Sequence, residues 1–153
     1  MATLYTIGHS TRSFGELVSA LKRHGIETLA DIRAFPVSRR LPHFNRESLE
    51  IELPKHGIRC DWMKALGGYR KATSEFEQAM AELLQIAENS RTAYMCAERV
   101  FFHCHRMIVS DWLTAHGHEV LHIDTEGPVR PHKLTAEARL VDDQVIYRGD
   151  QLF

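Results

Sequence analysis

Residues 95–106, with the sequence MCAERVFFHCHR, hold the densest group of chemically reactive side chains in this chain. The window contains two cysteines, two histidines, a glutamate and two arginines beside four large apolar residues. Such a mixture fits a metal site, an activated thiol, an anion-binding helix start, or a core strand with polar neighbours. We predict a buried strand at 92–97 that delivers Glu98, followed by a helix whose first turn contains Cys104.

Cys104 is the candidate nucleophile of this window. It lies at the predicted start of a helix, between His103 and His105, and both features favour the thiolate form of a cysteine. No arginine follows any cysteine by six positions, so the C-x5-R loop of phosphatases is absent. A stabilising polar pair is the competing interpretation of Cys104.

A metal site is a further interpretation of the same residues. Its ligands would be Cys96, Cys104 and His105, with His9 and His122 available from other strand ends. No C-x-x-C or H-x-x-x-H pair exists among them, so the ligands would have to come from separate elements. Because buried thiols without metal are commoner than such scattered sites, we assign no metal and keep this set as an alternative.

Polar side chains also follow the other predicted strands. They are His9 and Ser10 after a strand at 4–7, Asp31 and Arg33 after a strand at 28–32 with Ser38 and Arg39 in the next loop, and His122 in a strand at 119–123. Ligands of open parallel sheets bind beyond the carboxyl ends of the strands. We therefore expect these residues and Glu98 to line one cleft.

Arginines dominate this predicted cleft. Guanidinium groups bind carboxylate or phosphate with paired hydrogen bonds, and the start of a helix favours negative charge. We predict that Arg33, Arg39 and Arg106 hold the anionic part of a small phosphorylated or nucleotide-like substrate of an enzyme, a hydrolase or transferase. The groups available for proton transfer are His9, Asp31, Glu98 and His105, although Asp31 or Glu98 could instead orient an arginine.

The loop from Arg33 to Arg46 suggests a second function. It carries four arginines together with Phe35 and Phe44, which could stack on a base or another ring. A nucleic-acid-binding or processing module is therefore the alternative to an enzyme with a small substrate. The formal net charge is −1, so any basic patch must be local.

The elements that position these residues alternate along the chain. Besides the strands at 4–7, 28–32, 92–97 and 119–123, we predict one at 58–63, and helices after Ser13, at 47–56, from Ser74, and at 103–116. Alternation of this kind is typical of a mainly parallel sheet with helices on both faces. We predict an α/β three-layer sandwich with a small hairpin at 139–147.

The composition fits one domain over residues 1–153, because 153 residues with 44% hydrophobic content can build one core. The three scattered cysteines and a start without a signal-peptide pattern predict a cytoplasmic protein with reduced thiols. No apolar run approaches the roughly 20 residues that span a bilayer, so we expect no membrane partner. A G-x-G-x-x-G loop and a P-loop are both absent, and no cofactor is assigned.

Seven spaced motifs resemble the family catalogued as domain of unknown function 488. In order they are Thr6-Ile7-Gly8-His9-Ser10, Asp31-Ile32-Arg33 with Pro36, Ser38 and Arg39, Phe44, Leu66-Gly67-Gly68, Cys96-Ala97-Glu98, Cys104-His105-Arg106 and His122-Ile123. The resemblance runs from Thr6 to about Lys133 and implies an α/β cytoplasmic domain of prokaryotes without an established activity. Phe44, Gly67 and Gly68, which stand in these motifs, are further candidate ligand-binding residues.

Overall fold

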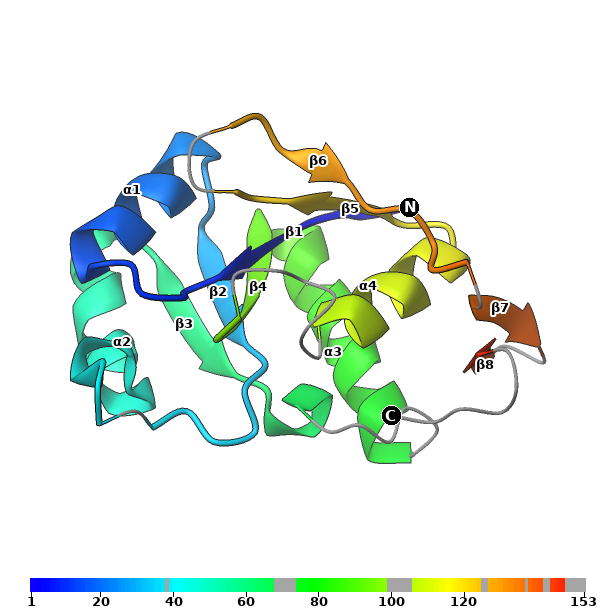
Figure 1. Ribbon diagram of the computed structural model, residues 1–153, viewed down its shortest axis with the longest axis horizontal. Helices are drawn as coiled ribbons and strands as arrows, with labels where there is room; N and C mark the ends of the chain where they lie inside the picture. Colours follow the sequence, from blue (N-terminus) through cyan, green and yellow to red (C-terminus); the bar gives the residue numbers. More distant parts are fainter. Residues whose placement is uncertain are drawn as a thin grey trace.

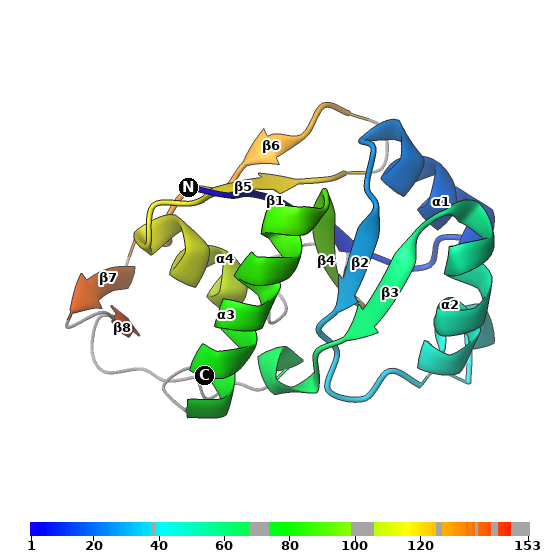
Figure 2. The same ribbon diagram turned by 180° about the vertical axis from the view of Figure 1, so that it is seen from behind.

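A central β-sheet with helices on both of its faces forms the body of the protein in the computed structural model (Figures 1 and 2). The structure describes residues 1–37, 39–67, 74–98, 106–124, 127–136, 138–141 and 144–147. Among these, no helix is long and apolar enough to cross a membrane. The predicted α/β three-layer sandwich is confirmed.

The sheet contains six strands, and a separate two-stranded hairpin lies near the end of the chain. The strands of the sheet are β1 (Thr3–Gly8), β2 (Thr28–Asp31), β3 (Arg59–Trp62), β4 (Thr92–Cys96), β5 (Glu119–His122) and β6 (Arg130–Pro131). The helices are α1 (Phe14–Arg23), α2 (Arg46–Glu52), α3 (Ser74–Asn89) and α4 (Arg106–Ala115). The predicted hairpin is confirmed as β7 (Ala138–Val141) paired with β8 (Gln144–Tyr147).

The two faces of the sheet have separate hydrophobic cores, because successive residues of a strand point to opposite faces. Leu29 of β2 packs in the core with Leu17 of α1 and Leu49 of α2. The next residue, Ala30, packs in the core with Met80 of α3 and with α4. Helices α1 and α2 therefore cover one face, and α3 and α4 cover the other (Figures 1 and 2).

Local sequence explains where these helices begin and end. A capping box starts α1, since the Ser13 side chain accepts a hydrogen bond from the Glu16 N–H and the Glu16 side chain accepts one from the Ser13 N–H. The helix predicted at 47–56 is divided into α2 and a 3₁₀ helix, Leu53–His56. Pro54 explains the change, because its ring and missing N–H do not fit the interior of an α-helix. The predicted first residues of α4, 103–105, lie outside the described residues.

The strand order β3-β2-β4-β1-β5-β6 creates a crevice at one edge of the sheet. The chain leaves β1 through α1 toward β2, whereas it leaves β4 toward α4 and β5 on the opposite side of β1. Because α1 follows β1 on one face of the sheet and α4 follows β4 on the other, the connections separate between β1 and β4, which is where open α/β sheets bind ligands. Past the strand ends, the N–H groups of His9 and Ser10 still bond to the carbonyls of Cys96 and Ala97, at 3.0 and 2.8 Å.

Candidate functional site

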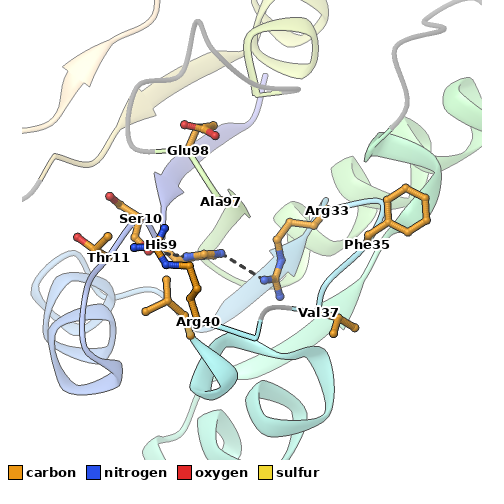
Figure 3. Close-up of a pocket in the computed structure, with 10 residues that line it drawn as sticks. His9, Ser10, Thr11, Arg33, Phe35, Val37, Arg40, Ala97 and Glu98 are labelled. Atoms are coloured by element: carbon orange, nitrogen blue, oxygen red, sulfur yellow. Dashed lines mark hydrogen bonds between the residues drawn. The ribbon is translucent and has the colours of Figure 1, made fainter.

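A pocket of about 660 Å³ opens at the crevice between the carboxyl ends of β1 and β4. Its polar residues are His9, Ser10, Thr11, Arg33, Arg40 and Glu98, and its apolar residues are Phe35, Val37, Leu41 and Ala97. In Figure 3, Ser10, Thr11 and Glu98 lie on one side, Phe35 and Val37 on the other, and Arg33 between them. The volume lies within the roughly 300 to 1,000 Å³ of small-molecule sites.

Arg33 is held rigidly at the pocket by Asp31. The Arg33 Nε and Nη2 atoms donate to the two carboxylate oxygens of Asp31 at 2.8 and 2.7 Å, and Nη2 also donates to the carbonyl of Phe44 at 2.7 Å. Asp31 is fully buried, and the Arg33 backbone N–H bonds to it as well. Both carboxylate oxygens of Asp31 are thus engaged by the arginine that they orient.

His9 is a neutral acceptor for the same guanidinium. Its Nδ1 donates to the Ser10 carbonyl at 2.9 Å, so its Nε2 carries the lone pair that accepts from Arg33 Nη1 at 3.3 Å. Burial is the main cause that lowers the pKa of His9 to about 4, and the charge of Arg33 lowers it as well. At pH 7 the His9 ring is therefore neutral, and its lone pair fixes the position of Arg33.

One hydrogen-bond donor of Arg33 remains for a ligand. A guanidinium has five N–H groups, and four are donated to Asp31, Phe44 and His9. Among the described residues no acceptor faces the fifth, which belongs to Nη1. Because Arg33 lines the pocket, this N–H is available there, while the charge of the guanidinium is balanced by Asp31.

The backbone beneath Arg33 is also fixed. The Trp62 indole N–H donates to the Arg33 carbonyl at 2.8 Å. Gly67 packs so closely beside this segment that a Cβ atom on it would lie 2.4 Å from the Ala34 nitrogen and 2.6 Å from the Ile32 oxygen. Gly67 therefore contributes by leaving space for the backbone and does not line the pocket; Gly68 lies outside the described residues.

Phe44 forms the floor under the site. Its side chain is fully buried, and its ring centroid lies 4.4 Å from that of His9. The sequence predicts Phe44 as a residue that contacts the ligand, whereas the structure places it beneath the histidine and gives its carbonyl to Arg33. The aromatic residue that lines the pocket is Phe35, which is exposed.

The remaining polar residues of the pocket are accessible. Ser10 adopts a left-handed backbone (φ 49°), which is rare for a residue with a side chain and is held by its N–H bond to Ala97. Glu98 and Arg40 are exposed, and within the described part of the chain neither side chain has a hydrogen-bonding partner. Arg39, the arginine named from the sequence, is exposed but does not line the pocket.

Arg106 and His122 belong to a second polar group, which lies outside the pocket among the described residues. Arg106 is 1% exposed, and its guanidinium donates to the Thr6 hydroxyl at 3.1 Å and to the Glu98 carbonyl at 2.8 Å. The His122 Nδ1 lies 2.7 Å from the same hydroxyl. Arg106 therefore supports the backbone of Glu98 from beneath the pocket.

This second group continues across the α4 side of the sheet. The His122 Nε2 lies 2.8 Å from the Nδ1 of His132, whose Nε2 donates to Asp111 at 2.8 Å. Burial, together with the charges of nearby residues, lowers the pKa of His122 to about 3, so this ring is neutral at pH 7. We call the residues Arg106, Thr6, His122, His132 and Asp111 the buried polar chain.

The predicted thiol and metal chemistry is only partly described by the structure. Cys96 is buried in the core with α3 and α4, with its Sγ 3.9 Å from the Glu98 carbonyl. Cys104, His105 and Ser38 lie outside the described residues, so the roles assigned to them stay predictions. Within the described ranges, no group of three His, Cys, Asp or Glu side chains could hold a metal ion.

The fold and the pocket together define an open-sheet α/β protein with a cavity at the point where the connections of its strands diverge. Residues 13–77 and 68–113 match the family described as Domain of unknown function DUF488, and together they span more than half of the chain. The chain therefore belongs to this family, as its motifs predict. No curated protein and no solved structure matches it.

Proposed function

We propose that this protein is an enzyme that acts on a small phosphorylated ligand bound between the ends of β1 and β4. One observation carries the proposal: a rigid Arg33 with one remaining N–H lines the same cavity as Arg40, Ser10, Thr11 and Glu98. A second described cavity, at the amino-terminal ends of the strands, contains one arginine, Arg91, with Glu27 and Glu88.

The anion subsite consists of Arg33 and Arg40, with hydroxyls nearby. A phosphate group offers several acceptor oxygens, and hydrogen bonds to charged groups contribute about 1.5–3 kcal/mol each. Arg33 supplies a donor whose position is fixed by Asp31 and His9, so little entropy is lost when it binds. Arg40 supplies a second, exposed guanidinium.

Glu98 is the proton-transfer group in this proposal. Its carboxylate is exposed at the pocket, while its backbone carbonyl is held by Arg106. It would accept the proton of a water that attacks the phosphorus, as a general base does, while the P–O bond to the alcohol of the ligand breaks and the released oxygen takes a proton from solvent. His9 and Asp31 orient Arg33 in this scheme, because their polar atoms are already engaged; Cys104 and His105 are the further catalytic residues predicted from the sequence.

Phosphate binding tests the anion subsite. We expect inorganic phosphate to raise the Tm of the wild-type protein and to have no such effect on Arg40→Ala. The matched control is Arg39→Ala, which removes an exposed arginine of the same loop that does not line the pocket. An Arg40→Ala protein that responds to phosphate as the wild type does would contradict the proposal.

Turnover tests the role of Glu98. With a chromogenic aryl phosphate as substrate, Glu98→Gln is expected to lose hydrolysis while its phosphate-induced Tm shift remains. Loss of both properties together would assign Glu98 to binding and not to proton transfer.

A second candidate function is the binding of single-stranded nucleic acid. Exposed Phe35, Val37, Arg39 and Arg40 on one loop favour it, because aromatic and basic side chains together bind bases and phosphates. This candidate predicts oligonucleotide binding at low salt that weakens steeply as salt is added. Absence of binding at low salt would remove it.

A further inference from the structure

The apolar side of the pocket indicates what the ligand carries besides its phosphate, and this inference rests on the proposed function. Phe35 is 84% exposed and Val37 is 75% exposed, which makes them the most exposed large apolar residues of the described chain after Met1. Both line the pocket. Clustered exposed apolar side chains are typical of binding surfaces.

The backbone presents Phe35 from a fixed position. The Val37 N–H bonds to the Phe35 carbonyl at 2.8 Å, and the Arg46 N–H bonds to the Pro36 carbonyl at 2.9 Å. On the other side, Trp62 holds the Arg33 carbonyl. The exposure of Phe35 is therefore set by a backbone anchored on both sides.

We infer that Phe35 stacks on the base of a nucleoside monophosphate whose phosphate is bound by Arg33 and Arg40. Arg33 and Phe35 line the same pocket, so a ligand bound by both needs an anionic group and a flat ring. The pocket, at about 660 Å³, suits a ligand of this size. Stacking of bases on aromatic side chains tolerates any base, since every base has a π-face.

The charges of the pocket favour a single nucleotide over a longer nucleic acid. Binding of a nucleic acid backbone requires a track of cations that contacts successive phosphates. Here Arg33 and Arg40 form a single anion subsite, and the exposed carboxylate of Glu98 on the pocket wall repels a neighbouring phosphate. The net charge of −1 supplies no wider attraction.

Isothermal titration calorimetry with two ligands distinguishes the affinity contributed by the base from that contributed by the phosphate. We expect wild-type protein to bind adenosine 5′-monophosphate about tenfold tighter than ribose 5-phosphate, which has the same phosphate and no base. Phe35→Ala is expected to bind both ligands with affinities within about twofold of each other, and ribose 5-phosphate as the wild type does. The control is Ile51→Ala, an equally apolar change at a residue of α2 that is 61% exposed and outside the pocket.

Each outcome of this experiment decides a different point. If the wild-type protein binds ribose 5-phosphate as tightly as adenosine 5′-monophosphate, the role of Phe35 is overturned and the proposed anion subsite stands. A tenfold gain that persists in Phe35→Ala also overturns it. Affinity that grows steadily with oligonucleotide length replaces the mononucleotide with single-stranded nucleic acid, and no binding of either ligand overturns both proposals.

Discussion

The pocket and the buried polar chain are built from similar side chains but differ in what those side chains leave unpaired. In the buried polar chain, all four ring nitrogens of His122 and His132 lie within 2.8 Å of a partner. In the pocket, Arg33 keeps one N–H, and Arg40 and Glu98 have no partner among the described residues. Hydrogen-bonding capacity that remains at a cavity, and not residue type, therefore distinguishes a candidate site from a structural network.

This difference predicts two kinds of response to substitution. Removal of one member of a fully paired buried network lowers the free energy of unfolding, because the other members lose their partners. Substitution of an exposed pocket residue changes the free energy of unfolding little and mainly changes ligand binding.

Removal of the Asp111 carboxylate has the largest expected effect. In Asp111→Ala the His132 Nε2 and the Thr135 N–H lose their buried acceptor, which destabilises the fold by about 3 kcal/mol. Asp124→Ala removes the exposed ion pair with Arg130 and is expected to cost less than about 1 kcal/mol. Urea unfolding measures both, and equal costs would show that the buried polar chain does not stabilise the protein.

Acid is expected to destabilise the protein through two neutral histidines. Folding lowers the pKa of His9 from 6.5 to about 4 and that of His122 from 6.5 to about 3, so the unfolded chain takes up protons first as the pH falls. The free energy of unfolding is therefore highest above pH 6.5, and it decreases by roughly 2 kcal/mol or more as the pH falls to 4.

Unfolding curves across this pH range test the assignment. His122→Gln should show a smaller decrease between pH 6.5 and 4 than the wild type, whereas His56→Gln, on the surface, should keep the wild-type slope. An unchanged slope in His122→Gln would contradict the assignment.

A Cβ atom at position 67 is expected to have an intermediate effect on stability and a strong one on binding. Gly67→Ala places the new atom 2.4 Å from the Ala34 nitrogen, so the loop that carries Arg33 must shift, at a cost of about 1.5 kcal/mol. Gly127→Ala meets no atom within 4 Å and serves as the control. The Gly67 variant should lose its Tm response to phosphate; a retained response would show that the position of this loop does not control binding.

Substitution of pocket residues has the smallest expected effect on stability. Arg40→Ala and Glu98→Gln should each change the free energy of unfolding by less than about 0.5 kcal/mol, because both side chains are exposed. Urea unfolding beside the phosphate-binding assay measures this contrast with Asp111→Ala. A large loss of stability in either variant would place it with the buried network.

The order of elements could be predicted because the apolar periodicity of strands and helices is local. The 3₁₀ continuation of α2 and the strand β6 were not predicted: Pro54 lies within an otherwise helical pattern, and the two residues of β6 show no periodicity. Strand β6 exists because it pairs with β5, which is a tertiary effect.

The edge of the sheet at which these side chains gather could also be predicted, but not the face to which each residue points. His9, Ser10, Arg33 and Glu98 line one pocket. His122 instead pairs in register with Thr6, and its side chain therefore points with Thr6 to the other side. A shift of one residue along a strand reverses the face, and strand ends carry no local signal for it.

Two further polar residues, one in the buried polar chain and one in the pocket, escaped prediction. Asp111 has the sequence context of a surface residue on a helix, and its buried partner His132 lies 21 residues later. Arg40 stands next to Arg39, and only the loop geometry decides which of the two lines the pocket.

A crystal structure of the protein with inorganic phosphate would show whether the pocket is an anion site. We expect a phosphate in the pocket, hydrogen-bonded to Nη1 of Arg33 and to Arg40. A pocket that holds only water at saturating phosphate, or a phosphate bound elsewhere on the molecule, would contradict it.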